Sequence, residues 1–75
     1  MKNKLNYFMV NVNGNNGYSF MVTTSDDTLT EEQVGEICLD KQLFDYDADF
    51  QYCTVSSMVF QDDIEFFKDC TYNID

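Results

Sequence analysis

Two segments near the N-terminus alternate between apolar and other side chains with the two-residue period of a β-strand. Each places three apolar side chains on one side: Phe8, Val10 and Val12 in Leu5–Val12, and Tyr18, Phe20 and Val22 in Tyr18–Thr23. The stretch Asn13–Gly17 between them is rich in asparagine and glycine, which tolerate positive φ. We therefore predict two antiparallel strands joined by a hairpin loop. A phosphate-binding loop is disfavoured here, because neither a GK[ST] motif nor a helix follows.

A helix is predicted to begin after Thr30, where several start signals coincide. Thr30 is a favourable N-cap, Gln33 stands three residues on as in a capping box, and Glu31 and Glu32 place negative charge in the first turn. Lys41 falls in the middle of the apolar face, so the helix should end near it. These signals are local, and they fix the start of the helix more firmly than its end.

The predicted helix has two distinct faces. Apolar side chains share the inward face (Val34, Ile37 and Cys38), and acidic side chains recur every four residues on the other side (Glu32, Glu36 and Asp40). Gly35 in the helix interior costs about 1 kcal/mol relative to alanine. Its presence indicates either a close contact with another element or simple tolerance.

The second half of the chain predicts one more strand and one more helix. Apolar and acidic residues alternate over Phe44–Phe50, and the stretch that follows is rich in strand formers, so we predict a third strand at about 50–56. A closing helix is predicted over Gln61–Asp69, with Ile64 and Phe67 on its inward face. The order β-β-α-β-α predicts one small α+β domain spanning residues 1–75, with a three-stranded, mainly antiparallel sheet and its helices packed on one face.

Charge is distributed very unevenly along the chain. Fourteen acidic residues stand against four lysines, which gives a net charge of −10 over 75 residues. Residues 1–25 carry a net charge of +2, and residues 26–75 carry −12. Such a surface repels nucleic acids and anionic lipids and attracts basic proteins. We therefore expect no direct nucleic-acid binding and no membrane association.

Most enzyme mechanisms are excluded by missing side chains. The chain has no histidine, and all four of its basic residues are lysines, so it offers neither an imidazole base nor a guanidinium clamp. The cysteines Cys38, Cys53 and Cys70 are odd in number and widely spaced, which suggests reduced thiols rather than a disulfide framework or a zinc site. We expect a non-enzymatic protein without a cofactor. The N-terminus lacks the features of a signal peptide, so the cytoplasm is its expected location.

Asp45, Asp47 and Asp49 form a DxDxD run, which resembles the opening of a calcium-binding loop. The rest of that motif does not fit, because Phe50 stands where the loop needs glycine and Ser56 stands where it needs glutamate. The alternative is an acidic edge segment that discourages pairing with other chains.

Taken together, the acidic residues suggest a partner-binding surface. One stripe lies on the first predicted helix. A second stripe lies on the closing helix and consists of Asp62, Glu65 and Asp69. The DxDxD run joins the two. Two neighbouring stripes of this kind approach the charge density of a nucleic-acid backbone. The alternative is that the acids serve solubility, although mixed charges would do so without self-repulsion.

Leu39 is an apolar residue on the acidic side of the first helix, close in angle to Glu32 and Glu36. An aliphatic side chain ringed by charge is typical of the centre of a protein interface. Alternatively, the closing helix covers Leu39 within the same molecule.

In its small size, strong acidity, β-rich module and lack of catalytic groups, the chain resembles the small phage-encoded inhibitors that include anti-CRISPR proteins and DNA mimics. The resemblance is one of composition, so it implies no particular site residue. It favours an inhibitor that occupies a basic nucleic-acid-binding surface of a host protein, such as a CRISPR effector or another defence nuclease. The alternative is a small interaction domain, a monomer or a homodimer, whose acidity serves solubility and which binds through exposed sheet edges and tyrosines.

Overall fold

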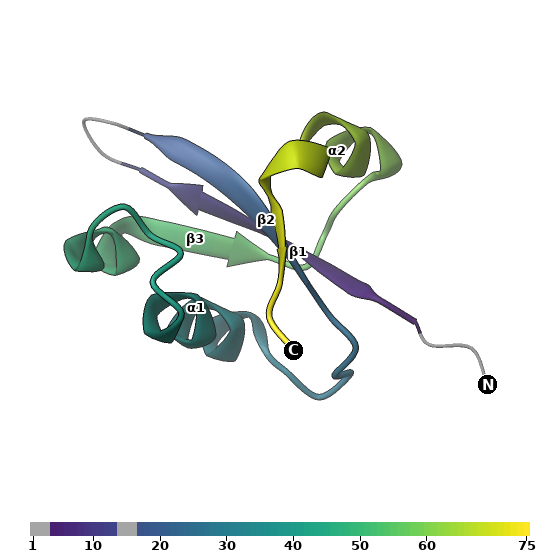
Figure 1. The fold of residues 1–75 in the computed structure, drawn as a ribbon, viewed down its shortest axis with the longest axis horizontal. Coiled ribbons are helices and arrows are strands. Elements are labelled where there is room, and N and C mark those ends of the chain that lie inside the picture. The colour runs from purple at the N-terminus through teal and green to yellow at the C-terminus, as the bar shows by residue number, and fades with distance from the viewer. Residues whose placement is uncertain (1–3, 14–16) are drawn as a thin grey trace.

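A tightly paired hairpin forms the centre of the structure (Figure 1). The computed structural model describes residues 4–13 and 17–75, and within them β1 (Asn6–Val12) pairs antiparallel with β2 (Tyr18–Thr24). The pairing sets Met9 against Met21 and Val10 against Phe20. Both strands are confirmed where the alternation predicted them. Residues 14–16 of the predicted hairpin loop lie outside the described residues.

The α+β class is confirmed, but the sheet has four strands rather than three. The remaining elements are α1 (Glu31–Asp40), the 3-10 helix η1 (Asp47–Tyr52), β3 (Cys53–Ser56), α2 (Gln61–Phe66), the 3-10 helix η2 (Lys68–Cys70) and β4 (Thr71–Asn73). The strand order is β3-β1-β2-β4. Because β3 runs antiparallel to β1 and β4 runs parallel to β2, the sheet is mixed rather than antiparallel throughout.

The principal core lies between α1 and one face of the sheet. The even-numbered apolar residues of β1 and β2 point to this face, as the two-residue period requires. There they meet two fully buried side chains of α1, Val34 and Cys38, together with Phe44 from the following loop and Ile74 beyond β4. The ring of Phe44 packs edge-to-face on Phe20, with 5.7 Å between centroids.

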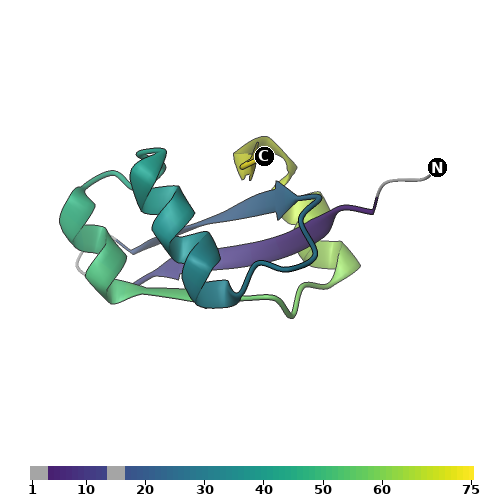
Figure 2. The same cartoon turned by 90° about the horizontal axis from the view of Figure 1, so that it is seen from below.

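The second face of the sheet is also covered, which contradicts the prediction that both helices pack on one face. Met21 is fully buried and Met9 is 9% exposed, yet both belong to the odd-numbered set that points away from α1. Figure 2 shows α1 in front of the sheet and α2 behind it, and Figure 1 shows the same two helices on opposite sides. The physical reason is that Met9 and Met21 make the centre of this second face apolar, so it needs its own cover.

Helix α1 begins and ends as predicted. The Thr30 hydroxyl accepts from the Gln33 amide at 3.1 Å, and the Gln33 side chain accepts from the Thr30 amide at 2.9 Å, which completes the capping box. Lys41 is the C-cap, and Gln42 then adopts a left-handed conformation with φ of 58°. This turn closes with a hydrogen bond from the Leu43 amide to the Cys38 carbonyl, and it directs the chain back toward the core.

The predicted third strand is too long at its start. Only Cys53–Ser56 is a strand, and the preceding residues form η1. In this conformation Phe50 packs edge-to-face on Phe44, with 6.2 Å between ring centroids. Packing of one aromatic ring against the core therefore outweighs the strand propensity of the segment. The closing helix is also shorter than predicted, because η2 replaces its last turn.

Strand β4 was not predicted, because three residues carry no readable period and a parallel partner is remote in sequence. It is held along β2, and the pairing continues beyond it through a hydrogen bond from the Ile74 amide to the Thr23 carbonyl at 2.9 Å. Tyr72 also packs edge-to-face on Phe20, with 5.8 Å between centroids. Among the described residues, no helix is long and apolar enough to cross a bilayer.

The Asp75 carboxylate fastens the end of the chain to the end of β2. It accepts hydrogen bonds from the Thr24 hydroxyl at 2.6 Å, from the Ser25 amide at 3.0 Å and from the Ser25 hydroxyl at 2.9 Å. These hydrogen bonds, that of Thr24 first, lower the pKa of Asp75 below its ordinary value. The ionised form is therefore the one that stabilises the fold.

We predict that Asp75→Asn lowers the melting temperature at neutral pH. Because the folded-state pKa is depressed, the stabilisation is present above about pH 4 and is lost as the pH falls through the folded-state pKa. Thermal unfolding of both proteins between about pH 7 and pH 2.5 should show the two melting curves converging in acid. Glu65→Gln removes the same charge from exposed α2 and is the control. An equal effect of both variants at every pH would contradict a specific role for Asp75.

Candidate functional site

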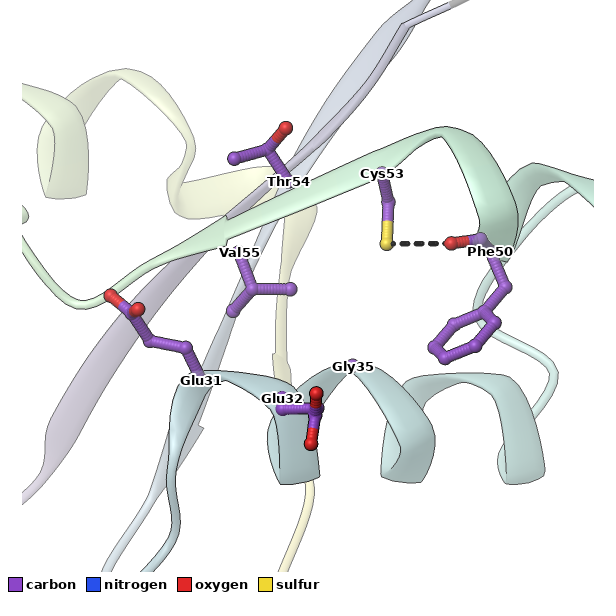
Figure 3. Close-up of a pocket in the computed structure, with 7 residues that line it drawn as sticks. All are labelled: Glu31, Glu32, Gly35, Phe50, Cys53, Thr54 and Val55. Atoms are coloured by element: carbon purple, nitrogen blue, oxygen red, sulfur yellow. Dashed lines mark hydrogen bonds between the residues drawn. The ribbon is translucent and has the colours of Figure 1, made fainter.

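A shallow groove runs between α1 and the edge strand β3 (Figure 3). Its volume is about 330 Å³. Phe50, Cys53 and Val55 line its apolar part, and the side chains of Val55 and Cys53 point from β3 toward the helix. Glu31 and Glu32 supply its acidic part from the first turn of α1. Thr54 also lines it, and its side chain points to the opposite side of the strand.

Gly35 has no side chain, so the floor of the groove lies close to the backbone of α1. It is buried in the middle of α1, and a Cβ placed on it would lie 3.4 Å from Val55 Cγ2 and 3.5 Å from Phe50 Cε1. These distances are ordinary van der Waals contacts, so alanine would fit without displacement. Glycine is therefore not required sterically, and its absent side chain leaves space between the helix and the strand.

Two polar contacts fix the ends of the groove. The Ser57 amide donates to the Glu31 carboxylate at 2.8 Å, which ties the end of β3 to the start of α1. The Cys53 thiol donates to the Phe50 carbonyl at 3.1 Å (Figure 3). Burial raises the pKa of the Cys53 thiol above its ordinary value, so the thiol is protonated and weakly nucleophilic at neutral pH. The groove is thus suited to binding rather than to covalent chemistry.

The predicted acidic stripe on α1 lies on the molecular surface. Glu32, Glu36 and Asp40 are all exposed, while Leu39 is half-buried and packs against the core. The closing helix does not cover Leu39, because α2 lies on the other face of the sheet. The fourteen acidic residues of the chain outnumber its four lysines, so most of its carboxylates cannot each have a lysine partner. Their mutual repulsion persists unless a basic partner relieves it.

The DxDxD segment is held by hydrogen bonds to a tyrosine hydroxyl. The Tyr18 hydroxyl accepts from the Asp45 amide at 2.8 Å and donates to the Asp49 carboxylate at 2.7 Å. Asp45 and Asp47 are exposed and Asp49 is half-buried. Within residues 4–13 and 17–75, no three His, Cys, Asp or Glu side chains gather as a metal-binding group. The three aspartates therefore form an ordered acidic segment, and their side chains do not gather around one point as metal ligands would.

Helix α2 carries the second acidic stripe, and it also exposes large apolar side chains. Asp62 and Glu65 are exposed on the helix, and Asp69 is exposed on η2. Phe66 is 81% exposed, Met58 75% and Phe60 66%. Aromatic side chains with this exposure are typical of a surface that is covered in a complex.

The structure places the two predicted stripes on opposite faces of the sheet, so they do not form one continuous surface. The α1 stripe neighbours the groove, and the α2 stripe neighbours the exposed apolar residues. Sequence reasoning missed Glu31, which we considered only as a helix-start residue, and it missed Phe66. The register of α2 carried the signal for Phe66, because it sets this phenylalanine four residues after Asp62 on the acidic side.

Compared with protein-family models, with curated proteins and with solved structures, the chain shows no significant match.

We predict that Tyr18→Phe lowers the free energy of unfolding by about 1–2 kcal/mol at neutral pH, because the two hydrogen bonds to Asp45 and Asp49 are lost. Burial raises the pKa of Tyr18 to about 12; the hydrogen bond from the Asp45 amide opposes this rise, and the Asp49 carboxylate adds to it. The neutral phenol is thus favoured by folding, and its stabilisation is complete below about pH 10 and lost as the pH rises toward 12.

Urea unfolding of both proteins at neutral pH and in alkali checks this prediction. The difference in stability between wild type and Tyr18→Phe should shrink above about pH 10. Tyr46→Phe is the matched control, since Tyr46 is 69% exposed. A pH-independent difference would contradict the role of the phenol.

Proposed function

We propose that this protein is a non-enzymatic binding protein that occupies a basic, nucleic-acid-binding surface of another protein. The observation that carries the proposal is the net charge of −10, with every acidic residue located after residue 25 and nearly all of them exposed. A groove or patch that evolved to hold phosphates presents lysine and arginine side chains at the surface. An acidic protein of this size can compete for that surface without resembling a nucleic acid in shape.

The proposed consequence is inhibition of the partner. A protein that covers a nucleic-acid-binding surface blocks access of the nucleic acid, whatever reaction the partner performs. A CRISPR effector or another defence nuclease is the target class that we propose, because such proteins hold guide and target strands in strongly basic channels. The opposed placement of the two stripes favours insertion of this protein into a channel with basic walls on both sides, rather than docking on a flat patch.

A second candidate function rests on the apolar residues near α2. Met58, Phe60 and Phe66 are largely exposed, and burial of such side chains stabilises a homodimer of a small interaction domain. In that case the acids serve solubility. The acids Asp62 and Glu65 on the same helix oppose this arrangement, because two copies would bring like charges together.

We predict that reversal of the α1 stripe separates binding from stability. The triple variant Glu32→Lys, Glu36→Lys, Asp40→Lys should fold, with a change in unfolding free energy below about 1 kcal/mol, because exposed charges contribute little. Association with a basic partner should slow by at least about tenfold, since long-range attraction steers the encounter. The measurement is surface plasmon resonance at about 50 and 500 mM salt.

The partner for this measurement is first recovered from bacterial lysate on immobilised protein and then purified. It supports the proposal only if it binds nucleic acid and this protein displaces that nucleic acid. The triple variant Asp62→Lys, Glu65→Lys, Asp69→Lys changes the net charge equally on the other face, and in a channel with basic walls on both sides it should slow association as well. A triple reversal on α1 that retains wild-type association and competition would remove this stripe from the site.

Light scattering over a range of protein concentrations separates the two candidate functions. The proposed inhibitor is monomeric without its partner. A dimer that persists at high salt and dissociates in Phe66→Ser would overturn that expectation and establish the homodimeric interaction domain instead.

A further inference from the structure

We infer that the outer edge of β3, together with the groove below it, binds an extended segment of a basic partner protein by strand addition. This inference rests on the proposed function, because the partner is the same basic protein. It adds the site and the mode of recognition, namely main-chain hydrogen bonds to Val55 and a side chain of the partner in the groove.

Strand β3 is an edge strand, and its outward main-chain groups can be identified from the register. Within residues 4–13 and 17–75, β1 is its partner on one side and no strand pairs with the other. The Asn13 amide donates to the Tyr52 carbonyl, so this pair is hydrogen-bonded, and the alternation of an antiparallel ladder makes Thr54 and Ser56 hydrogen-bonded as well. Val55 therefore directs both its amide and its carbonyl away from β1.

The neighbouring outward groups of this edge are protected. The Cys53 amide donates to the Phe50 carbonyl at the end of η1, and the Ser57 amide donates to the Glu31 carboxylate. These contacts shorten the free edge to the region around Val55, which limits pairing with arbitrary chains. An incoming strand can pair with Val55 without displacing any contact of the fold.

The groove lies where a side chain of that incoming strand would point. In a hydrogen-bonded pair, the two side chains lie on the same face of the sheet. The side chain opposite Val55 would thus extend toward α1, over Gly35 and beside Phe50. The space there suits an aliphatic side chain, because apolar groups form most of the lining. Main-chain hydrogen bonds supply the affinity, and the groove determines which side chain of the partner fits.

Charge selects a basic segment as the occupant. Glu31 and Glu32 border the groove on the α1 side, and Glu36 and Asp40 continue the same acidic surface along the helix. Lysine or arginine two residues before or after the aliphatic residue would lie on the same face of the added strand and would approach these carboxylates. A second copy of this chain, with its net charge of −10, would be repelled.

The test uses a designed probe, the acetylated and amidated peptide Thr-Lys-Thr-Val-Thr-Lys-Thr, titrated into ¹⁵N-labelled protein. We expect the largest amide shifts at Val55 and its neighbours on β3, with small shifts at α2. A peptide with glutamate in place of both lysines should bind at least about 100-fold more weakly. The peptide with an N-methylated valine cannot donate to the Val55 carbonyl, and its affinity should fall at least about tenfold.

Two protein variants test the groove. Gly35→Leu places an aliphatic side chain in the groove and should weaken binding of the peptide at least about tenfold. Gly35→Ala is the matched control, because it raises helix propensity by a similar mechanism while adding one methyl group that fits. Gly35→Ala should weaken binding less than Gly35→Leu does, because one methyl group fills only part of the space over Gly35. If Gly35→Leu fails to fold, the N-methylated peptide with wild-type protein decides the question.

The outcomes separate this inference from the proposed function. If the N-methylated peptide binds as tightly as its parent, or if the shifts map to α2, strand addition at β3 is wrong, while capture of a basic partner is unaffected. If the peptide binds as expected but no nucleic-acid-binding partner is recovered and displaced, the proposed function is wrong and the strand-addition site stands.

Discussion

The structure depends on pairing of two strands whose central residues are apolar on both faces. The same triplet occurs in each strand, Phe8-Met9-Val10 and Phe20-Met21-Val22, and the register sets these triplets against each other. Phenylalanine and valine point to one face and methionine to the other. A hairpin of this kind cannot have a solvated face, so the rest of the chain must supply two covering layers. In a chain of only 75 residues, most of the elements outside the hairpin are needed to form these two layers.

The two layers are unequal, and the inequality determines which surfaces remain available. Helix α1 buries Val34 and Cys38 fully and brings Phe44 into the same core. Helix α2 has only six residues and none of them is buried. It lies on the methionine face of the sheet, while its one aromatic residue, Phe66, remains in solvent. The two surfaces left available are therefore the groove above Gly35, at the edge of the well-packed layer, and the exposed Phe66 on the outside of the thin layer.

Signals from neighbouring residues in the sequence predicted the ends of the first helix correctly. They did not predict structure that depends on residues far apart in the sequence. The capping box at Thr30 and the end of the helix at Lys41 depend on neighbouring residues, and both were predictable. Strand β4 depends on a parallel partner about fifty residues away, so its residues alone do not reveal it. The second covered face was readable in principle, because Met9 and Met21 break the alternation that a solvated face requires. The acidic candidates were identifiable by residue type, but their separation onto opposite faces depends on that second covering layer.

The acidity of the chain and the free edge at β3 constrain each other. An unpaired edge beside an apolar groove is a site at which identical chains associate and aggregate. Here η1 and the Glu31–Ser57 contact shorten that edge, and carboxylates line the adjacent helix. Like charge then opposes pairing between copies of the chain, because each copy would bring the same carboxylates to the edge. A positively charged incoming segment would instead be attracted by these carboxylates. On the proposal made above, the carboxylates that oppose self-association are therefore also those that favour a basic partner.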